Sequence, residues 1–352
     1  LKMSPRIVVV GSCMIDFTCF SPSLPKPGET LIGHNYEIKY GGKGANQCIV
    51  ANKLGASTAI VASLGCDIYA QEYLKIFKKE NIDASHVQIQ PNQHSGIAHI
   101  TVADNGENCI VAVLGSNAAL SPEHVDSAID VIKGANVLLC QFETPIETTL
   151  HALRLFKFHG WSHLEMLQAM TGVELVGSSS MEQAINILLD KGCNTVILTL
   201  GEQGAAYASQ DDRSVKLVPT TRGAGDAFLG AFAYFKAYHP NISMNECIRR
   251  ACVVATESVL KSGTHASFPN RSDLSPDLFT FQRRVGRKTK PTLVRDEPLK
   301  VDLVDQGYSK NCWRPGLQES RCNKDTFVNW FIVTNCVTKC APFPNSASIY
   351  VL

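Results

Sequence analysis

The strongest constraint on the fold is an alternation of two sequence patterns that runs through about the first 265 residues. Short runs of β-branched residues alternate with longer amphipathic stretches, which is typical of an α/β fold with a largely parallel sheet. Strands are predicted at Arg6–Val10, Thr58–Ser63, Asn136–Cys140 and Asn194–Thr199. Helices are predicted at Gly44–Leu54, Ile68–Glu80, Pro122–Lys133, Thr148–Phe158, Met181–Lys191, Ala224–Tyr238 and Met244–Lys261.

A second pattern interrupts this alternation. Strand-like runs without intervening helices occur at Thr30–Tyr40, Gly96–Val102 and Cys109–Leu114, with a further strand expected near residues 13–20. Strands inserted in this way predict a small sheet that stands off the main domain and serves as a lid. The alternation ends before residue 283, so we expect one domain over residues 1–282 and leave residues 283–352 as a tail without an assigned structure.

Charge and composition exclude several classes of protein. The chain carries 33 Lys and Arg against 32 Asp and Glu, a balance that argues against a broadly nucleic-acid-binding protein. No apolar run approaches the about 18 residues that a membrane span requires, so no membrane partner is expected. The 13 cysteines include no C-x-x-C pair and indicate reduced thiols. The cytoplasm is the expected compartment, with the nucleus as a second.

Two glycine-rich segments precede predicted helices. Gly41–Gln47 reads GGKGANQ, and its glycines allow a ligand to approach the backbone, although a structural helix cap is an equal alternative. The second segment is Gly223-Ala224-Gly225-Asp226, whose successive amides can form an anion hole for a phosphoryl group. The carboxylate of Asp226 is placed to accept a proton from a substrate hydroxyl, unless it is only a charge at a helix start.

Three further features follow predicted strands. Residues Thr199–Gly204 form a glycine-bearing turn after a strand, which is where open α/β sheets bind ligands. Asp16 and Glu143 each follow a strand, and a carboxylate there can accept protons from two neighbouring sugar hydroxyls. Each feature alone is more simply a loop. Together they place acids, glycine turns and a candidate base along one edge of the sheet.

In this order, the segments GGKGANQ at 41–47 and GAGDAF at 223–228 resemble the two signatures of the PfkB family of carbohydrate kinases. The lysine in the first signature is closer to the ribokinase branch than to adenosine kinases or fructokinases. The resemblance implies a three-layer α/β/α ribokinase-like domain with a mainly parallel central sheet and a small β-sheet lid. It further implies ATP-dependent phosphorylation of D-ribose to D-ribose 5-phosphate, by a homodimer.

The resemblance also assigns site residues. Asp226 is the expected general base, and the amides of Gly223, Ala224 and Gly225 form the expected anion hole. The sugar site, which includes Asp226, is expected to contain Met14, Ile15, Asp16, Gly42, Lys43, Gly44, Ala45, Asn46 and Glu143. The ATP site is expected at Thr199, Leu200, Gly201, Glu202, Gln203, Gly204 and Gly225. The family uses Mg²⁺ with ATP and an activating K⁺, whose loop would contain Ser258, Lys261, Gly263 and Ser267.

The chain departs from the family pattern at two internal joins. Where the family has two sheet strands and an Asn-x-x-Glu motif for nucleotide and Mg²⁺, only Gly160–Gln168 intervenes, with His163 and Met166 at the motif positions. At the second join Thr220 stands where the family has an aspartate, and Arg222 abuts the catalytic glycines. Loss of two strands would leave backbone groups of the sheet unpaired.

These departures keep three interpretations open. The chain is a ribose kinase, another PfkB-type sugar or nucleoside kinase, or a catalytically impaired pseudokinase that binds sugar. A shortened splice form, an imperfect gene model and a decayed relative each account for the joins. The tail carries 12 basic against 6 acidic residues and four cysteines whose spacing fits no compact zinc site, so a solvated tail is the simpler interpretation.

Overall fold

A nine-stranded sheet forms the centre of the protein. The computed structural model describes residues 6–156, 177–190, 193–200, 204–219, 224–261, 263–280, 330–336 and 347–351. The central strands are β1 (Arg6–Val10), β4 (Ser57–Gly65), β5 (Asp83–Gln90), β8 (Val137–Gln141), β9 (Thr195–Leu200), β10 (Ala205–Ser209), β11 (Lys216–Val218), β12 (Trp330–Cys336) and β13 (Ala347–Val351). Their order is β11-β10-β9-β13-β12-β8-β1-β4-β5, and β10 and β13 run against the others.

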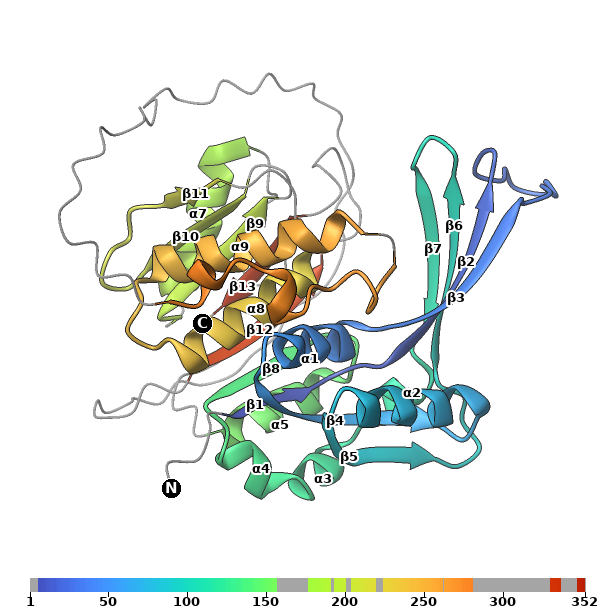
Figure 1. Cartoon of the computed structure of the whole chain (residues 1–352), viewed down its shortest axis with the longest axis horizontal. Helices are drawn as coiled ribbons and strands as arrows, with labels where there is room; N and C mark the ends of the chain where they lie inside the picture. Colours follow the sequence, from blue (N-terminus) through green and yellow to red (C-terminus); the bar gives the residue numbers. More distant parts are fainter. Residues whose placement is uncertain are drawn as a thin grey trace.

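Helices cover both faces of this sheet, which confirms the three-layer prediction (Figure 1). Alternate residues of β1 explain the layers, because Ile7 and Val9 enter one hydrophobic cluster while Val8 and Val10 enter another. The first cluster lies under α1 (Lys43–Lys53), α2 (Ile68–Lys79), α8 (Gly225–Tyr238) and α9 (Met244–Val259). The opposite face carries α3 (Pro122–Asp126), α4 (Ile129–Lys133), α5 (Ile146–Leu155) and α7 (Gly177–Asp190). Among these described helices, none is long and apolar enough to cross a membrane.

The single helix predicted at Pro122–Lys133 is instead two short helices, α3 and α4. Ser121 caps α3 as its sequence suggests, because its hydroxyl accepts a hydrogen bond from the amide of His124. The break falls at Ser127 and Ala128, where the Ser127 hydroxyl donates to the carbonyl of His124 at 2.6 Å. A serine that bonds its own backbone competes with continued helix, which accounts for the interruption.

The smaller sheet contains β2 (Met14–Ser21), β3 (Asn35–Gly41), β6 (Gly96–Ala103) and β7 (Asn108–Val113). Its order is β3-β2-β6-β7, and in Figure 1 it projects away from the helix-covered body. The strands predicted at Gly96–Val102 and Cys109–Leu114 agree with β6 and β7, whereas β3 begins five residues after the predicted start at Thr30. The predicted small second sheet is therefore confirmed as an element of the fold.

Two strands of the central sheet come from the C-terminal part of the chain, for which no structure was predicted. β12 pairs in parallel with β8, from Trp330 opposite Val137 to Thr334 opposite Gln141. β13 is antiparallel to both β12 and β9, and thereby joins the two halves of the sheet. The expectation that the shortened join leaves the sheet unpaired is therefore wrong for the edges of β8 and β9. The boundary at residue 282 itself remains a prediction.

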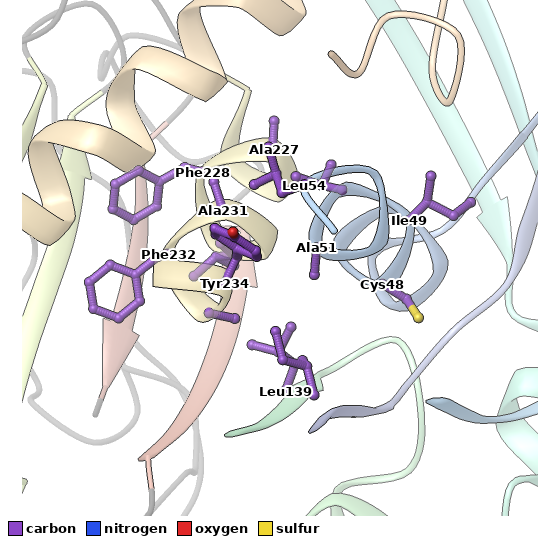
Figure 2. Close-up of a cluster of buried hydrophobic side chains, with 14 of the residues drawn as sticks. Cys48, Ile49, Ala51, Leu54, Leu139, Ala227, Phe228, Ala231, Phe232 and Tyr234 are labelled. Carbon is purple, nitrogen blue, oxygen red and sulfur yellow. The ribbon is translucent and has the colours of Figure 1, made fainter. Parts of the chain in front are cut away.

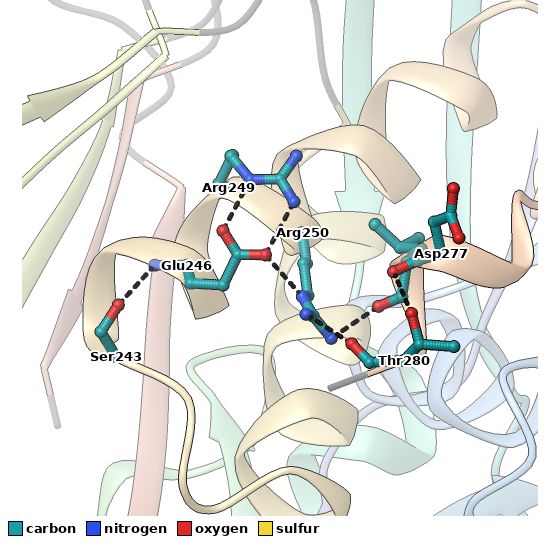
Figure 3. Close-up of polar contacts among 7 residues, drawn as sticks. Ser243, Glu246, Arg249, Arg250, Asp277 and Thr280 are labelled. Atoms are coloured by element: carbon teal, nitrogen blue, oxygen red, sulfur yellow. Dashed lines mark hydrogen bonds and ion pairs between the residues drawn. The ribbon is translucent and has the colours of Figure 1, made fainter. Parts of the chain in front are cut away.

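The described segment that ends at Thr280 is fixed to α9 by one arginine. Arg250 is 5% exposed, and its guanidinium donates to the carbonyls of Leu278 at 2.7 Å and Thr280 at 3.0 Å. Its Nε also donates to Glu246, which accepts two hydrogen bonds from Arg249 as well (Figure 3). The guanidinium therefore satisfies two carbonyls after the short 3₁₀ turn Pro276–Leu278 and holds that turn against α9.

Candidate active site

The glycines of the first motif bring the start of α1 against the turn between β1 and β2. Gly42 has a φ of 91°, and a Cβ there would lie 2.7 Å from the amide nitrogen of Met14. A Cβ on Gly44 would lie 2.5 Å from the amide nitrogen of Ser12. Only glycine fits both positions, so the motif first serves the close approach of the helix to the strand turn.

Glu143, which follows β8, accepts a hydrogen bond from the first backbone amide of α1. Its Oε2 accepts hydrogen bonds from the backbone amide of Lys43 at 3.0 Å and from the hydroxyl of Ser12 at 2.5 Å. Its Oε1 pairs with the Lys43 ammonium at 2.7 Å. Burial raises the pKa of Glu143, but the charge and hydrogen bonds of Lys43 and the hydroxyl of Ser12 outweigh burial and hold it below its ordinary value. The carboxylate is therefore ionised at neutral pH.

Asp226 lies in the first turn of α8 and faces the same end of α1. Its Oδ2 accepts a hydrogen bond from the side-chain amide of Asn46, and its Oδ1 accepts one from Gln47, each at 2.9 Å. Burial raises its pKa, although the bond from Gln47, the charge of Lys43 and the bond from Asn46 act against that shift. A carboxylate with a raised pKa at a helix start is suited to accept a proton.

The helices that carry these residues pack tightly. Figure 2 shows the buried side chains at their contact, among them Ala51 of α1, Leu54 directly after α1, Ala227 and Ala231 of α8, and Leu139 of β8 beneath them. The small side chains allow a short distance between the helix axes. The two predicted signatures, far apart in the sequence, therefore meet where both helices begin.

Asp16 lies within β2 of the small sheet, in agreement with the strand expected near residues 13–20. Burial raises its pKa to about 6, and the charges of Glu143 and Asp226 act in the same direction. The three predicted acids therefore lie close enough to influence one another, with Lys39 and Lys43 as nearby positive charges. Such a group of acceptors and donors is suited to a ligand rich in hydroxyls.

Other predicted sugar residues lie beneath this surface. Ile15 and Ala45 are fully buried, Met14 is 4% exposed, and Gly44 is buried against Ser12. These residues shape the site from below, while Asp16, Gly42, Lys43, Asn46, Glu143 and Asp226 are gathered at the meeting of α1, α8 and β2. Their roles as ligand contacts remain predictions.

Three of the seven residues predicted for the nucleotide site, and Gly223 of the expected anion hole, lie outside the described residues. Gly201, Glu202, Gln203 and Gly223 fall there, as do His163, Met166, Thr220 and Arg222. Of the described members, Thr199 and Leu200 end β9, Gly204 has a φ of 100°, and Ala224 and Gly225 open α8. A positive φ requires glycine at 204, so this turn is fixed by its backbone.

The predicted K⁺ loop is not gathered into a cation site by the described contacts. The hydroxyls of Ser258 and Ser267 donate to the carbonyls of Ala255 and Thr264, each at 2.8 Å, within their own turns. Lys261 pairs with Asp273 at 3.6 Å, and Gly263 has a φ of 115°. The ammonium of Lys53 already binds the loop carbonyls of His265 and Phe268. Within the described residues, no group of three or more His, Cys, Asp or Glu side chains is placed to hold a metal ion.

Sequence reasoning missed three polar residues around Asp226. Gln47 ends the first motif, Gln141 precedes Glu143 by two positions, and His265 donates to Asn46 through Nε2 at 3.0 Å. Burial lowers the pKa of His265 to about 3, so the ring is neutral and Nε2 carries its proton. The available signal was that all three lie close in the sequence to residues predicted for the site. Their hydrogen-bond partners, however, depend on how α1, β8 and the loop that contains His265 pack together.

Comparison with known proteins identifies relatives over most of the chain. The pattern described as pfkB family carbohydrate kinase matches residues 4–160 and 164–271. Ribokinase of Mus musculus is 35% identical over 305 residues, which cover 78% of this chain and 94% of the mouse protein. Deoxyribokinase of Salmonella typhi is 32% identical over 295 residues, covering 75% of this chain and 95% of the bacterial protein.

The fold is similar to that of solved structures. The structure of Arabidopsis thaliana ribokinase complexed with ribose and ATP superimposes with a TM-score of 0.66 at 26% sequence identity. The match covers 80% of this chain and all of the plant protein (100%). The ribokinase from Giardia lamblia gives a TM-score of 0.68 at 23% identity and supports the same fold.

Proposed function

This chain belongs to the pfkB family of carbohydrate kinases, and we propose from that membership that it transfers the terminal phosphoryl group of ATP to D-ribose. The product is D-ribose 5-phosphate. The observation that carries the proposal is the meeting of the two signatures, in which Asn46 and Gln47 hold the carboxylate of Asp226 at the start of α8. ATP as the donor is supported by the plant relative, whose structure contains ribose and ATP.

In the proposed reaction Asp226 acts on the primary hydroxyl of the sugar. Each of its oxygens accepts one amide hydrogen bond and retains a lone pair for the hydroxyl proton. As the O–H bond breaks, the sugar oxygen forms a bond to the terminal phosphorus of ATP, and the bond to the bridging oxygen of ADP breaks. The opening amides of α8, which begins at Gly225, stabilise negative charge on the transferred group.

The remaining polar groups orient the sugar. Asp16 faces the site from the small sheet and accepts hydrogen bonds from sugar hydroxyls when it is ionised. Both oxygens of Glu143 are engaged by Lys43 and Ser12, so its proposed contact with the sugar includes a rearrangement of these bonds or a contact through Lys43. Holding the hydroxyl in line with the phosphate is most of what such catalysis requires of the protein.

The proposed steps rest on residues of this chain rather than on a metal ion. The family's Mg²⁺ would neutralise charge on the ATP phosphates, but the described residues contain no cluster of ligands for it. The proposed steps therefore use only the carboxylates, amides and backbone groups of this chain.

The proposal includes a homodimer formed by the small sheet. In the register of that sheet, Asp16 shares its face with Lys39 and Ala98, while Phe17 lies in the row of Ile38, His99 and Val111 on the opposite face. Ile38 and Val111 are 45% and 63% exposed, so this outer face presents apolar side chains. A second copy would cover them, and light scattering of the purified protein with and without Val111→Lys tests this.

A substrate panel tests the activity. ATP consumption would be measured with D-ribose, 2-deoxy-D-ribose, D-fructose and adenosine, and D-ribose is expected to give the highest kcat/KM. The deoxyribokinase relative makes 2-deoxy-D-ribose the second candidate substrate. Highest efficiency with adenosine or fructose would identify another kinase of the family. Ribose-dependent thermal stabilisation without ATP turnover would identify a sugar-binding pseudokinase.

A further inference from the structure

Two buried glutamines form a chain of hydrogen bonds that ends on Asp226. Gln47 donates through Nε2 to Oδ1 of Asp226 at 2.9 Å, and Gln141 donates through Nε2 to Oε1 of Gln47 at 2.8 Å. An ionised carboxylate can only accept, so the NH₂ group of Gln47 must face Asp226. Its oxygen then faces Gln141 and requires a donor there. The orientation of both amides is therefore set by the charge of Asp226.

The surroundings leave these side chains little freedom. Gln47 and Gln141 are both fully buried. A Cβ on Gly11 would lie only 1.8 Å from Oε1 of Gln141, so the glycine provides the space that this amide occupies. A buried amide that leaves its partner loses hydrogen bonds that no water replaces, which makes the chain of contacts rigid.

We propose that Gln47 is a positioning residue for Asp226, and that Gln141 holds Gln47 in the orientation that this role requires. The inference rests on the proposed function, in which Asp226 removes the proton of the sugar hydroxyl. Gln47 aims the carboxylate and stabilises its ionised form, while Asn46 fixes the other oxygen. Pre-set donors of this kind reduce the reorganisation that the reaction would otherwise need.

The charges around Asp226 define what a variant should change. Lys43 favours the ionised form, whereas Glu143 and Asp16 disfavour it, and all three remain when Gln47 is replaced. Loss of the Gln47 donor removes one interaction that favours the carboxylate, so the pKa of Asp226 should rise. The acid limb of the rate profile then moves to higher pH, because a protonated Asp226 cannot accept the hydroxyl proton.

The first experiment measures kcat, KM and the pH dependence of kcat/KM with ribose and ATP for Gln47→Met. The expected loss in kcat is roughly 10- to 100-fold, the range seen when the outer partner of a functional group is removed. KM for ribose should change little, and the acid limb should move to higher pH because the pKa of Asp226 rises. Gln141→Met should give a smaller loss in kcat with a shift of the acid limb in the same direction.

Asn52→Leu is the matched control. Asn52 is another amide of α1, and it donates to the hydroxyl of Thr58 at 3.1 Å rather than to Asp226. We expect this variant to lose some thermal stability but to keep the kcat and pH profile of the unchanged protein. A Gln47→Met variant that behaves like Asn52→Leu, with lower stability alone, would overturn the positioning role.

A second experiment does not depend on activity. The carboxyl carbon of aspartate is labelled with ¹³C, and the signal that disappears in Asp226→Asn is followed by NMR through a pH titration. The titration midpoint should be higher in Gln47→Met and Gln141→Met than in the unchanged protein. An unchanged midpoint in both variants contradicts the inference, even if the protein is an active ribose kinase. An inactive protein with the expected midpoints would instead contradict the proposed function.

Discussion

Gly230 of α8 lies so close to Gln47 of α1 that a Cβ on the glycine would come within 2.5 Å of the Gln47 carbonyl oxygen. The same Cβ would lie 2.7 Å from Cβ of Val50. Asp226 precedes Gly230 by about one turn of α8. Its carboxylate accepts the hydrogen bond that the Gln47 side chain of α1 donates. Because Gly230 has no side chain, α8 can lie at the distance from α1 that brings Asp226 to Gln47.

We expect Gly230→Ala to lower both stability and kcat. The added methyl group must push α8 away from backbone atoms of α1, which costs about 1–3 kcal/mol and exceeds the gain in helix propensity. Asp226 moves with α8, so the loss of kcat should exceed the loss of ribose affinity. Urea unfolding and steady-state kinetics measure the two effects.

The matched control for this change is Gly134→Ala, because a Cβ there would meet its nearest neighbour, the carbonyl of Asp130, only at 3.2 Å. That variant should keep its kcat. Equal effects of the two alanine variants on kcat would show that α8 does not need Gly230 to place Asp226.

Asp226→Asn should abolish turnover while it retains the sugar. Asparagine keeps the size of the side chain but cannot accept a proton, and loss of a general base typically lowers kcat about 100- to 10,000-fold. Calorimetric titration with ribose should give a dissociation constant near that of the unchanged protein. An asparagine variant with substantial turnover would remove Asp226 from the role of base.

Asp16 should make ribose affinity depend on pH. Its pKa is raised to about 6, so the carboxylate proposed to accept sugar hydroxyls is protonated as the pH falls through this value. The dissociation constant for ribose should be constant above pH 7 and increase below about pH 6. In Asp16→Asn the affinity should be weaker and lack this transition, and an unchanged transition would assign it to another group.

The same carboxyl should reduce stability at neutral pH. Because the folded pKa lies above the unfolded one, the folded state binds more protons between about pH 4 and pH 6, and stability falls as the pH rises through that window. Asp16→Asn removes this effect and should raise the free energy of unfolding at pH 7 by about 1–3 kcal/mol. Thermal unfolding at pH 4 and pH 7 checks the sign, since the gain should be small at pH 4.

Arg250→Met should destabilise the domain far more than Arg249→Met. Arg250 is buried and its loss leaves the carbonyls of Leu278 and Thr280 without their donor, at about 2–3 kcal/mol. Arg249 bonds the same Glu246 on the surface, where such a pair contributes less than about 1 kcal/mol. Urea unfolding compares the two, and similar losses would contradict the anchoring role of Arg250.

Glu246 adds a pH dependence to that comparison. Hydrogen bonds from Arg249, opposed by burial and supported by Arg250, lower the pKa of Glu246 to about 2. The contribution of the ionised Glu246 to the free energy of unfolding is therefore complete above the unfolded pKa of about 4.3. It is lost as the pH falls toward 2. The difference in stability between the unchanged protein and Arg250→Met should narrow over this window.

The fold and the centre of the site follow from the sequence because their signals are local. The strand at Arg6–Val10 was predicted with the bounds that it has, since its β-branched residues are buried on both faces. Asn46 and Asp226 meet because each lies in a glycine-rich helix start, and α1 and α8 pack against each other in the same hydrophobic cluster.

The parts that sequence reasoning missed depend on contacts between distant segments. The partner of Gln47 is Gln141, 94 positions away, and nothing near either residue indicates the other. Likewise, residues suited to strands occur in Trp330–Cys336 and Ala347–Val351. Their place in the sheet, however, depends on pairing with β8 and β9, which lie far away in the sequence. Strand pairing over such separations leaves no local pattern in the sequence.

That pairing makes the C-terminal strands necessary for the domain. β12 is hydrogen-bonded to β8 on one side and to β13 on the other. Its removal would therefore leave backbone groups of β8 without partners, which costs free energy of folding. We expect removal of residues 330–352 to abolish the cooperative unfolding transition and with it the ribose-dependent stabilisation.

Ile332→Pro, which removes one amide from β12 opposite Leu139, should lower the unfolding midpoint strongly. Leu217→Pro in β11 is the control and should lower it less, because among the described strands β11 pairs only with β10. A chain that ends at residue 329 and unfolds at the same temperature, with ribose binding intact, would show that the sheet does not need these strands.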